Sequence, residues 1–486
     1  MKKIYIIFIS AIASCALASA QQLNSAYFTE GYKFRHQINP AFASSRNYLS
    51  LGIGNVSLAT RSNMGISTFL YPVDGQLTTF MNSAVSADEF LGKLRRKNVF
   101  GADISENLMS TGVWGKNGFT TVELNVKLSA AVNLPKDLFS FMKNVGQSQS
   151  YNISNLGVRA RSYMELAVGH SHSITERLNI GAKVKFLVGL IDAEARIDNM
   201  RVNMDGEQWR VEANGSLYAA APGLDVGTKA GSNEIDFNSI SLFEFEDGDD
   251  VNSIIRQITG GIGYGAAIDL GATYELIDGL TLSAAVVDLG FMTCGNAITA
   301  HTDNQQPWMF DGFDNIAINN PDSENSIDNQ LNALGEDLKE LIRMYKDEGT
   351  SRKAEMLTAT LNLGAEYKLP FYRKLSAGFL YSNRFSGPYS KYEGRFFVNV
   401  HPVKWFEFST NYGISNHGSS WGAALSLDFP GVGIFLGTDN IFWNVTPPIV
   451  EGLAISSVPY NKANVSLNFG LTFNLSKLRH LGDSRD

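Results

Sequence analysis

The sequence predicts an all-β fold, a transmembrane antiparallel up-and-down β-barrel of about 14–16 strands with helical insertions in its loops. Three observations predict it. Long segments alternate strictly between apolar and polar residues, short and long connections alternate along the chain, and no segment after residue 20 offers the roughly 18 apolar residues of a spanning helix. Soluble strands usually run about five or six residues, whereas a strand tilted across a bilayer needs roughly nine to eleven.

The stretch 464–477, NVSLNFGLTFNLSK, is the clearest of these segments. Its odd positions from Val465 to Leu475 are apolar, and its even positions are small or polar. Because successive side chains of a strand point to opposite faces, one face meets lipid and the other the lumen. We expect this stretch to be the closing strand. The same alternation recurs at 122–134, 178–190 and 357–369, and in shorter form at 268–277, 405–415 and 421–429.

The connections form a second pattern. Short turns are predicted at Asp205-Gly206, Asp278-Gly279, 370–374, 402–404 and Pro430-Gly431. The long connections are 218–267, 291–356 and 438–463, with shorter ones near 387–392 and 416–420. Bacterial barrels keep short turns on the periplasmic side and long loops on the other side. We therefore expect every long connection at one end of the barrel.

The first residues indicate export. Residues 1–20 carry two lysines, an apolar stretch and the small-residue site Ala18-Ser19-Ala20, which predicts a signal peptide cleaved near Ala20-Gln21. An alternative is lipidation of Cys15, because Ile12-Ala13-Ser14-Cys15 loosely matches a lipoprotein signal. We expect the outer membrane of a Gram-negative bacterium as the location.

The remaining chain divides into three parts. Residues 21–60 are an N-terminal segment that serves as a lumen plug or as the first strand, 61–475 form the barrel, and 476–486 are a charged tail expected in the periplasm. Two long connections also contain helical periodicity, at 327–345 and at 136–145. Their apolar stripes predict loop helices that cover the barrel mouth or neighbouring loops.

Composition excludes several classes of protein. Charged residues are only 18% of the chain, and aromatic residues reach 11%. The acidic balance, with a pI of about 5.5, argues against nucleic acid as a partner. Cys294 is the only cysteine after the predicted signal peptide, so disulfide bonds do not hold the fold.

Motifs that suggest catalysis lie in unsuitable positions. Gly418-Ser419-Ser420-Trp421-Gly422 matches the G-x-S-x-G nucleophile elbow, which requires a strand, a sharp turn and then a helix, but here it leads into a strand. Gly261-Ile262-Gly263-Tyr264-Gly265 resembles a dinucleotide-binding loop but precedes a strand as well. We predict no enzyme activity, no catalytic residues and no cofactor.

Two groups could attract a metal. His170 and His172 share one face of a strand but have no marked third ligand. Glu244 to Asp250 is an acidic loop whose order differs from an EF-hand, so a solvated loop is favoured over divalent bridging to lipopolysaccharide. We assign no metal site.

The stretch QQLNSAYFTEGYKFRHQINPAFASSRNYLSLGIG, residues 21–54, resembles the start of an outer-membrane barrel family of unknown function found in Bacteroidota. Asn39-Pro40-Ala41 is also similar to a tripeptide near the start of long-chain fatty-acid transporter barrels and of barrels that serve type IX secretion. These resemblances imply a barrel with an N-terminal segment. The tripeptide is either a turn that enters the first strand, which we favour, or part of a plug that contacts a ligand.

Two classes of function remain open. In the first, the barrel passes or gathers small solutes, apolar ones as the transporter resemblance implies. In the second, it is a non-transporting scaffold for a surface or secretion complex. Expected partners are outer-membrane lipid, lipopolysaccharide, and either an apolar solute or a secretion-complex protein. The polar faces of the predicted strands supply the candidate lumen-lining residues Lys127, Lys183, Lys185, Glu366, Lys368, Glu407 and Asp428.

Overall fold

The computed structural model describes residues 23–52, 54–73, 76–144, 150–205, 208–241, 261–303, 308–310, 343–441 and 464–475. The predicted signal peptide, the acidic loop 244–250, most of the predicted helix 327–345 and the charged tail lie outside these ranges. None of the helices in the described ranges has the length and apolar character needed to cross a bilayer.

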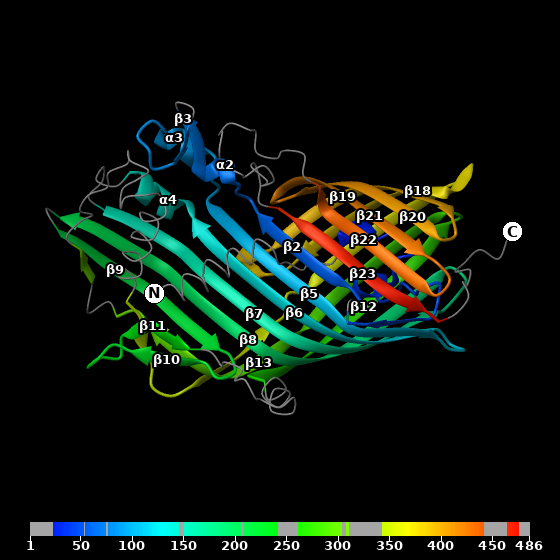
Figure 1. Cartoon of the computed structure of the whole chain (residues 1–486), viewed down its shortest axis with the longest axis horizontal. Coiled ribbons are helices and arrows are strands. Elements are labelled where there is room, and N and C mark those ends of the chain that lie inside the picture. The colour runs from blue at the N-terminus through cyan, green and yellow to red at the C-terminus, as the bar shows by residue number, and fades with distance from the viewer. Residues whose placement is uncertain are drawn as a thin grey trace.

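Fourteen antiparallel strands form a closed barrel, which confirms the predicted fold class (Figure 1). In ring order they are β1 (Tyr48–Leu51) continued by β2 (Val56–Ser62), β5 (Lys97–Trp114), β6 (Phe119–Pro135), β7 (Ser150–Ser173), β8 (Leu178–Asp205), β12 (Gly263–Ile277), β13 (Leu280–His301), β17 (Thr360–Leu369), β18 (Tyr372–Arg384), β19 (Lys391–Val403), β20 (Phe406–Ser415), β21 (Gly418–Asp428), β22 (Val432–Ile441) and β23 (Ser466–Asn474).

Strand β23 closes the ring, as predicted. It pairs with β22 on one side and with β1 and β2 on the other. Leu467 and Phe473 are 41% and 47% exposed on the outer face, whereas Asn468 and Thr472 are buried on the inner face. No backbone edge is therefore left open, and the predicted assignment of the two faces is confirmed.

Short connections gather at one end of the barrel, here called the short-turn end; the opposite end is the long-loop end. The connections at the short-turn end are 115–118, 174–177, 278–279, 370–371, 404–405 and 429–431. The turn at Asp205-Gly206 was predicted at the short-turn end, and this prediction was wrong. Strand β8 starts at the short-turn end and runs 28 residues, so the turn into β9 (Gln208–Ala220) lies at the long-loop end.

Strands β5–β9 and β13 continue past the rest of the wall and form an extension at the long-loop end (Figure 1). In the extension, strand β9 takes the place between β8 and β13 that β12 has nearer the short-turn end. It pairs with the parts of β8 and β13 that lie toward the long-loop end. The extension has its own apolar core, which includes Ile153, Ile197, Met200, Val202 and Val211.

Smaller elements complete the long-loop end. They are α2 (Ile66–Phe69), β3 (Leu70–Val73), β4 (Gln76–Thr79), α3 (Ala87–Gly92), α4 (Lys136–Lys143), β10 (Asp225–Thr228), β11 (Ile235–Ser241), β14 (Trp308–Phe310), β15 (Tyr345–Lys346), β16 (Ser351–Met356) and η3 (Gly387–Tyr389). Helix α4 confirms the helix predicted at 136–145, and its Phe139 packs with Phe80 and Phe90 in a second apolar cluster.

Residues 23–47 lie inside the barrel and are here called the plug. The plug contains two short 3₁₀ helices, η1 (Asn24–Ala26) and η2 (Lys33–Gln37). The described part of the predicted segment 21–60 thus contains both a lumen plug and the first wall strand.

Candidate functional site

Aromatic side chains pack the plug against the inner wall of the barrel. Phe34 is fully buried between Tyr48 and Phe435, with ring centroids 5.8 Å from each. Phe28 meets the wall residue Phe397 edge to face at 5.0 Å. Because interiors of this kind are close-packed, the plug closes the middle of the lumen.

Polar contacts fix the start of the plug near the long-loop end. The carboxylate of Asp439 accepts hydrogen bonds from the backbone N–H groups of Asn24 and Ser25 at 3.2 and 2.7 Å. The amide of Asn24 donates to Glu393 at 2.5 Å. The N–H groups that a short helix leaves free at its start are thereby satisfied.

A second set of contacts fixes the plug near the short-turn end. Glu407 accepts hydrogen bonds from the backbone N–H groups of Glu30 and Gly31 at 2.9 and 2.7 Å. The carboxylate of Asp428 lies 3.0 Å from Lys33 Nζ and 3.1 Å from Arg46 Nε. All of these anchors are hydrogen bonds or ion pairs to side chains of the barrel wall.

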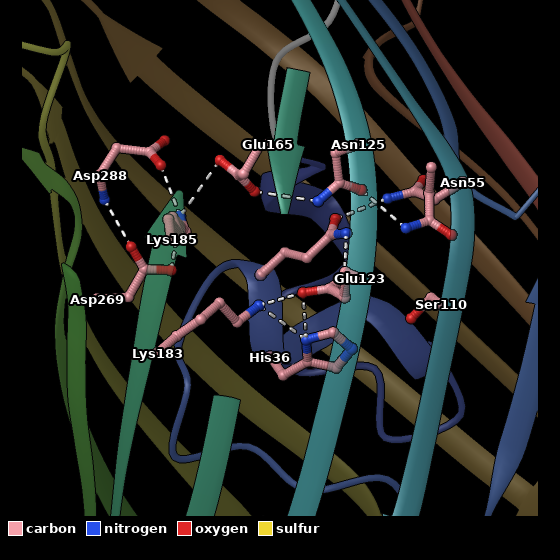
Figure 2. A network of polar contacts seen from close by, with 12 residues as sticks. His36, Asn55, Ser110, Glu123, Asn125, Glu165, Lys183, Lys185, Asp269 and Asp288 are labelled. Atoms are coloured by element: carbon pink, nitrogen blue, oxygen red, sulfur yellow. Dashed lines mark hydrogen bonds and ion pairs between the residues drawn. The ribbon is translucent and has the colours of Figure 1, made fainter. Parts of the chain in front are cut away.

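His36 joins the plug to the opposite wall (Figure 2). Burial lowers the pKa of His36 to about 3, although the carboxylate of Glu123 opposes this shift. The imidazole is therefore neutral near pH 7. Its Nδ1 then accepts from the ammonium of Lys183 at 3.1 Å, which also pairs with Glu123, and its Nε2 donates to the Tyr48 hydroxyl at 2.7 Å.

Asn39-Pro40-Ala41 forms a turn inside the lumen, where the Asn39 side chain accepts a hydrogen bond from the Ala41 N–H at 3.0 Å. Two wall glycines make room for it. A Cβ at Gly181 would lie 2.1 Å from the Pro40 carbonyl oxygen, and a Cβ at Gly271 would lie 2.1 Å from Asn39 Oδ1. The turn thus seats the plug on the wall, well before strand β1 begins.

Beside His36 lies a cluster of five wall charges, of which Figure 2 shows Glu165, Lys185, Asp269 and Asp288. Lys185 is paired with Asp269 at 2.7 Å and with Asp288 at 2.6 Å. Lys127 is paired with Glu165 at 2.7 Å. These ion pairs connect strands that are adjacent or two places apart in the ring, so they hold this part of the inner wall in one arrangement.

Two cavities lie on opposite sides of the plug. The outer cavity, of about 140 Å³, faces the long-loop end, and the plug residues Asn24 and Gln37 contribute to its lining. The inner cavity, of about 570 Å³, lies at the short-turn end beneath Phe28, Glu30 and Gly31. Plug residues thus contribute to the lining of both cavities.

The structure divides the seven predicted lumen residues between these cavities. Lys127, Lys183 and Lys185 line the outer cavity. Glu366, Lys368, Glu407 and Asp428 line the inner cavity. Lys368, Glu407 and Asp428 bind the plug directly, and Glu366 instead accepts from the Ser376 hydroxyl at 2.5 Å.

Sequence reasoning missed the acidic partners of these cations. Glu123 and Glu165 occupy the polar face of alternating strands, so the alternation itself could have identified them. Asp288 could not be found in that way. It has a positive φ of 58° at a bulge where the alternation of β13 changes phase, and two consecutive side chains, Val287 and Asp288, turn inward.

The other motifs have structural positions. The stretch 418–422 begins strand β21, and 263–265 begin β12, so neither lies between a strand and a helix. His170 shares a 2.9 Å hydrogen bond with Thr120, and its ring lies 6.3 Å from that of His172. Within the described ranges, no group of three His, Cys, Asp or Glu side chains is arranged to hold a metal ion.

Comparison with known proteins gives no match among curated proteins. Among solved structures, a TodX monoaromatic hydrocarbon channel mutant shares 11% identity with a TM-score of 0.42, covering 94% of this chain and 95% of that chain. The Ralstonia pickettii toluene transporter TbuX shares 10% identity with a TM-score of 0.40, and the match covers 92% of this chain and 94% of that chain. A Pseudomonas aeruginosa FadL homologue shares 10% identity with a TM-score of 0.41, and the match covers 94% of this chain and 100% of that chain. A family model matches residues 40–439, and the chain belongs to the Family of unknown function DUF5723.

Proposed function

We propose that this protein is an outer-membrane barrel that passes small solutes when its plug leaves the lumen. One observation carries the proposal: a segment held only by non-covalent contacts separates two cavities of one closed barrel. A fourteen-strand barrel is wider than the roughly eight-strand barrels whose wall side chains alone fill the interior, so the plug is what closes this lumen.

The outer surface supports the membrane location. Outward-facing side chains of the wall are large and apolar, for example Val184, Phe186 and Leu270, which are 64%, 51% and 50% exposed. Exposed apolar area on this scale is costly in water and favourable in lipid. Lipid and lipopolysaccharide are then the partners of the wall. Heat-modifiable migration in SDS gels and resistance to alkaline extraction test this location.

A plug lock tests the passage of solutes. A Cβ at Gly31 would lie 3.1 Å from the Cβ of Ser426, near the roughly 3.5–4.5 Å that a disulfide spans. The double variant Gly31→Cys, Ser426→Cys should block solute flux into liposomes when oxidised and restore it when reduced. Deletion of residues 23–46 should give permanent flux.

A matched lock outside the lumen controls for oxidation. A Cβ at Gly227 in β10 would lie 3.0 Å from the Cβ of Ser239 in β11, and this pair does not touch the plug. Gly227→Cys, Ser239→Cys should leave flux unchanged. If the plug deletion passes no solute at all, the proposal is wrong.

A scaffold for a surface or secretion complex is the second candidate. The extension favours it, because an apolar core around Met200 and the cluster around Phe90 build a folded body beyond the wall. A scaffold would keep its function with the plug locked. The apolar class of solute, implied by resemblance, stays a prediction. The polar residues that line the outer cavity favour a different class of solute.

A further inference from the structure

Three side chains in the lining of the outer cavity, Asn55, Arg61 and Asn468, carry buried polar atoms without protein partners. Asn468 on β23 is fully buried, and neither its Oδ1 nor its Nδ2 has a hydrogen-bond partner. Arg61 on β2 is 3% exposed, and its Nε has none. Buried polar groups are normally paired, so these atoms indicate that the cavity binds a molecule with hydrogen-bonding groups.

The charge around Arg61 is unbalanced. The carboxylate of Asp103 pairs with Arg61. It also accepts hydrogen bonds from both terminal nitrogens of Arg384, at 2.8 and 2.9 Å. Arg384 comes from β18, far around the ring from β2 and β5, so this contact crosses the lumen. One carboxylate thus faces two guanidinium groups, which leaves a local excess of one positive charge.

Size and lining restrict what can fill this space. The cavity of about 140 Å³ suits a compact group, and its lining is mostly polar or charged. The aliphatic side chains in that lining are Ile104, Leu128, Ala131 and Leu357. A long hydrocarbon chain would leave the buried guanidinium and amide groups unpaired, which is unfavourable.

We propose that the outer cavity binds the oxyanion group of a small solute, a carboxylate or a phosphate, at the guanidinium of Arg61 beside the Asp103–Arg384 pair. Guanidinium groups donate paired hydrogen bonds that match both oxyanions. Asn468 lines the same cavity from β23, so its amide N–H and its carbonyl oxygen are available to other polar groups of that solute. The inference rests on the proposed function, because it names the class of solute that the barrel takes up.

Calorimetric titration of the full-length protein in maltoside micelles tests binding without passage. The probes are inorganic phosphate and acetate, with glucose as the uncharged control. Phosphate or acetate should bind saturably, and glucose should not. Asn468→Asp keeps the side-chain shape but places a negative charge in the cavity, so the affinity for either anion should fall at least tenfold.

Asn399→Asp is the matched control. Asn399 is also a buried inward-facing wall residue, but it lies beside the inner cavity, where it donates to Ser376 at 3.0 Å. Its affinity for the anions should equal that of the wild type. Arg61→Lys keeps the charge and removes the forked geometry, so it provides a second variant with weakened binding if Asn468→Asp does not fold.

The outcomes separate the inference from the proposed function. Binding of phosphate alone, of acetate alone or of both supports the inference and identifies the source of the oxyanion. Absence of binding by either probe means that water fills the cavity and overturns the inference, even if the plug lock controls flux. Equal binding by wild type and Asn468→Asp overturns it as well. Anion binding without any flux in the plug deletion would leave this site in place and remove only the passage function.

Discussion

The two halves of strand β8 have opposite chemistry. From Leu178 to about Gly189, apolar residues such as Val184 point outward, and polar residues such as Lys183 point inward. Beyond Asp192 the pattern reverses: Arg201 is exposed, and Met200 is buried in the extension core. One continuous strand therefore changes from an apolar outer face to a polar outer face, and the reversal marks the boundary of the apolar belt.

This comparison shows that alternation by itself defines two faces but does not define their surroundings. In the lower half, from Leu178 to about Gly189, the inner face meets His36 and the Asn39-Pro40-Ala41 turn of the plug. In the upper half, beyond Asp192, the inner side chains share an apolar core with side chains of the neighbouring strand β9, of α4 and of the short strands β10 and β11. The same period of two serves a wall with an apolar outer face in one place and a sheet with a polar outer face in the other.

The largest expected effect compares two outward positions of β8. Val184→Arg should cost about 2–4 kcal/mol if the site meets the bilayer, and it should block membrane assembly. Asn199→Arg, outward in the upper half, should assemble normally. Heat-modifiable migration in SDS gels measures both. Normal assembly of Val184→Arg would show that this face does not meet lipid.

The next comparison exchanges the two inward residue types. Lys183→Met leaves Glu123 buried without its closest cation, and removal of one partner of a buried pair costs about 3–5 kcal/mol. We expect the plug to become accessible to protease while the barrel still forms. Lys183→Met combined with Glu123→Leu should restore protection, because an apolar pair can replace a buried ion pair. No difference between the single and double variants would contradict this account.

In the upper half, the matched change is Met200→Lys. A charge in the extension core should unfold the extension locally, whereas truncation by Met200→Ala should cost about 2–5 kcal/mol. Limited proteolysis should cut the extension and spare the barrel. Cleavage of both regions at the same rate would mean that they unfold as one unit.

The sequence predicted the barrel because each wall strand carries its own alternation, and strands such as β17 and β23 follow it without interruption. It predicted the inward lysines for the same reason. It could not predict the extension, because Asp205-Gly206 is an equally good tight turn at either end of a barrel. The bulge at Asp288, with its positive φ, interrupts the alternation, so Asp288 could not be predicted to face the lumen. The docking of the plug depends on Gly181 and Gly271, which lie far from the plug in the chain.

The smallest expected effect is a pH dependence confined to the lower half. The docked plug holds His36 with a pKa of about 3, whereas a released plug would have a value near 6.5. Because the released form binds the proton more readily, docking is fully stable above pH 6.5 and weakens as the pH falls toward 3. At pH 5 the loss is about 2 kcal/mol, so protease should cut the plug faster than at pH 7.5. His36→Gln removes the titrating group and should flatten this difference, while cleavage of the extension around Met200 should follow the same pH profile in both proteins. If acid accelerates plug cleavage equally with His36→Gln, another group governs docking.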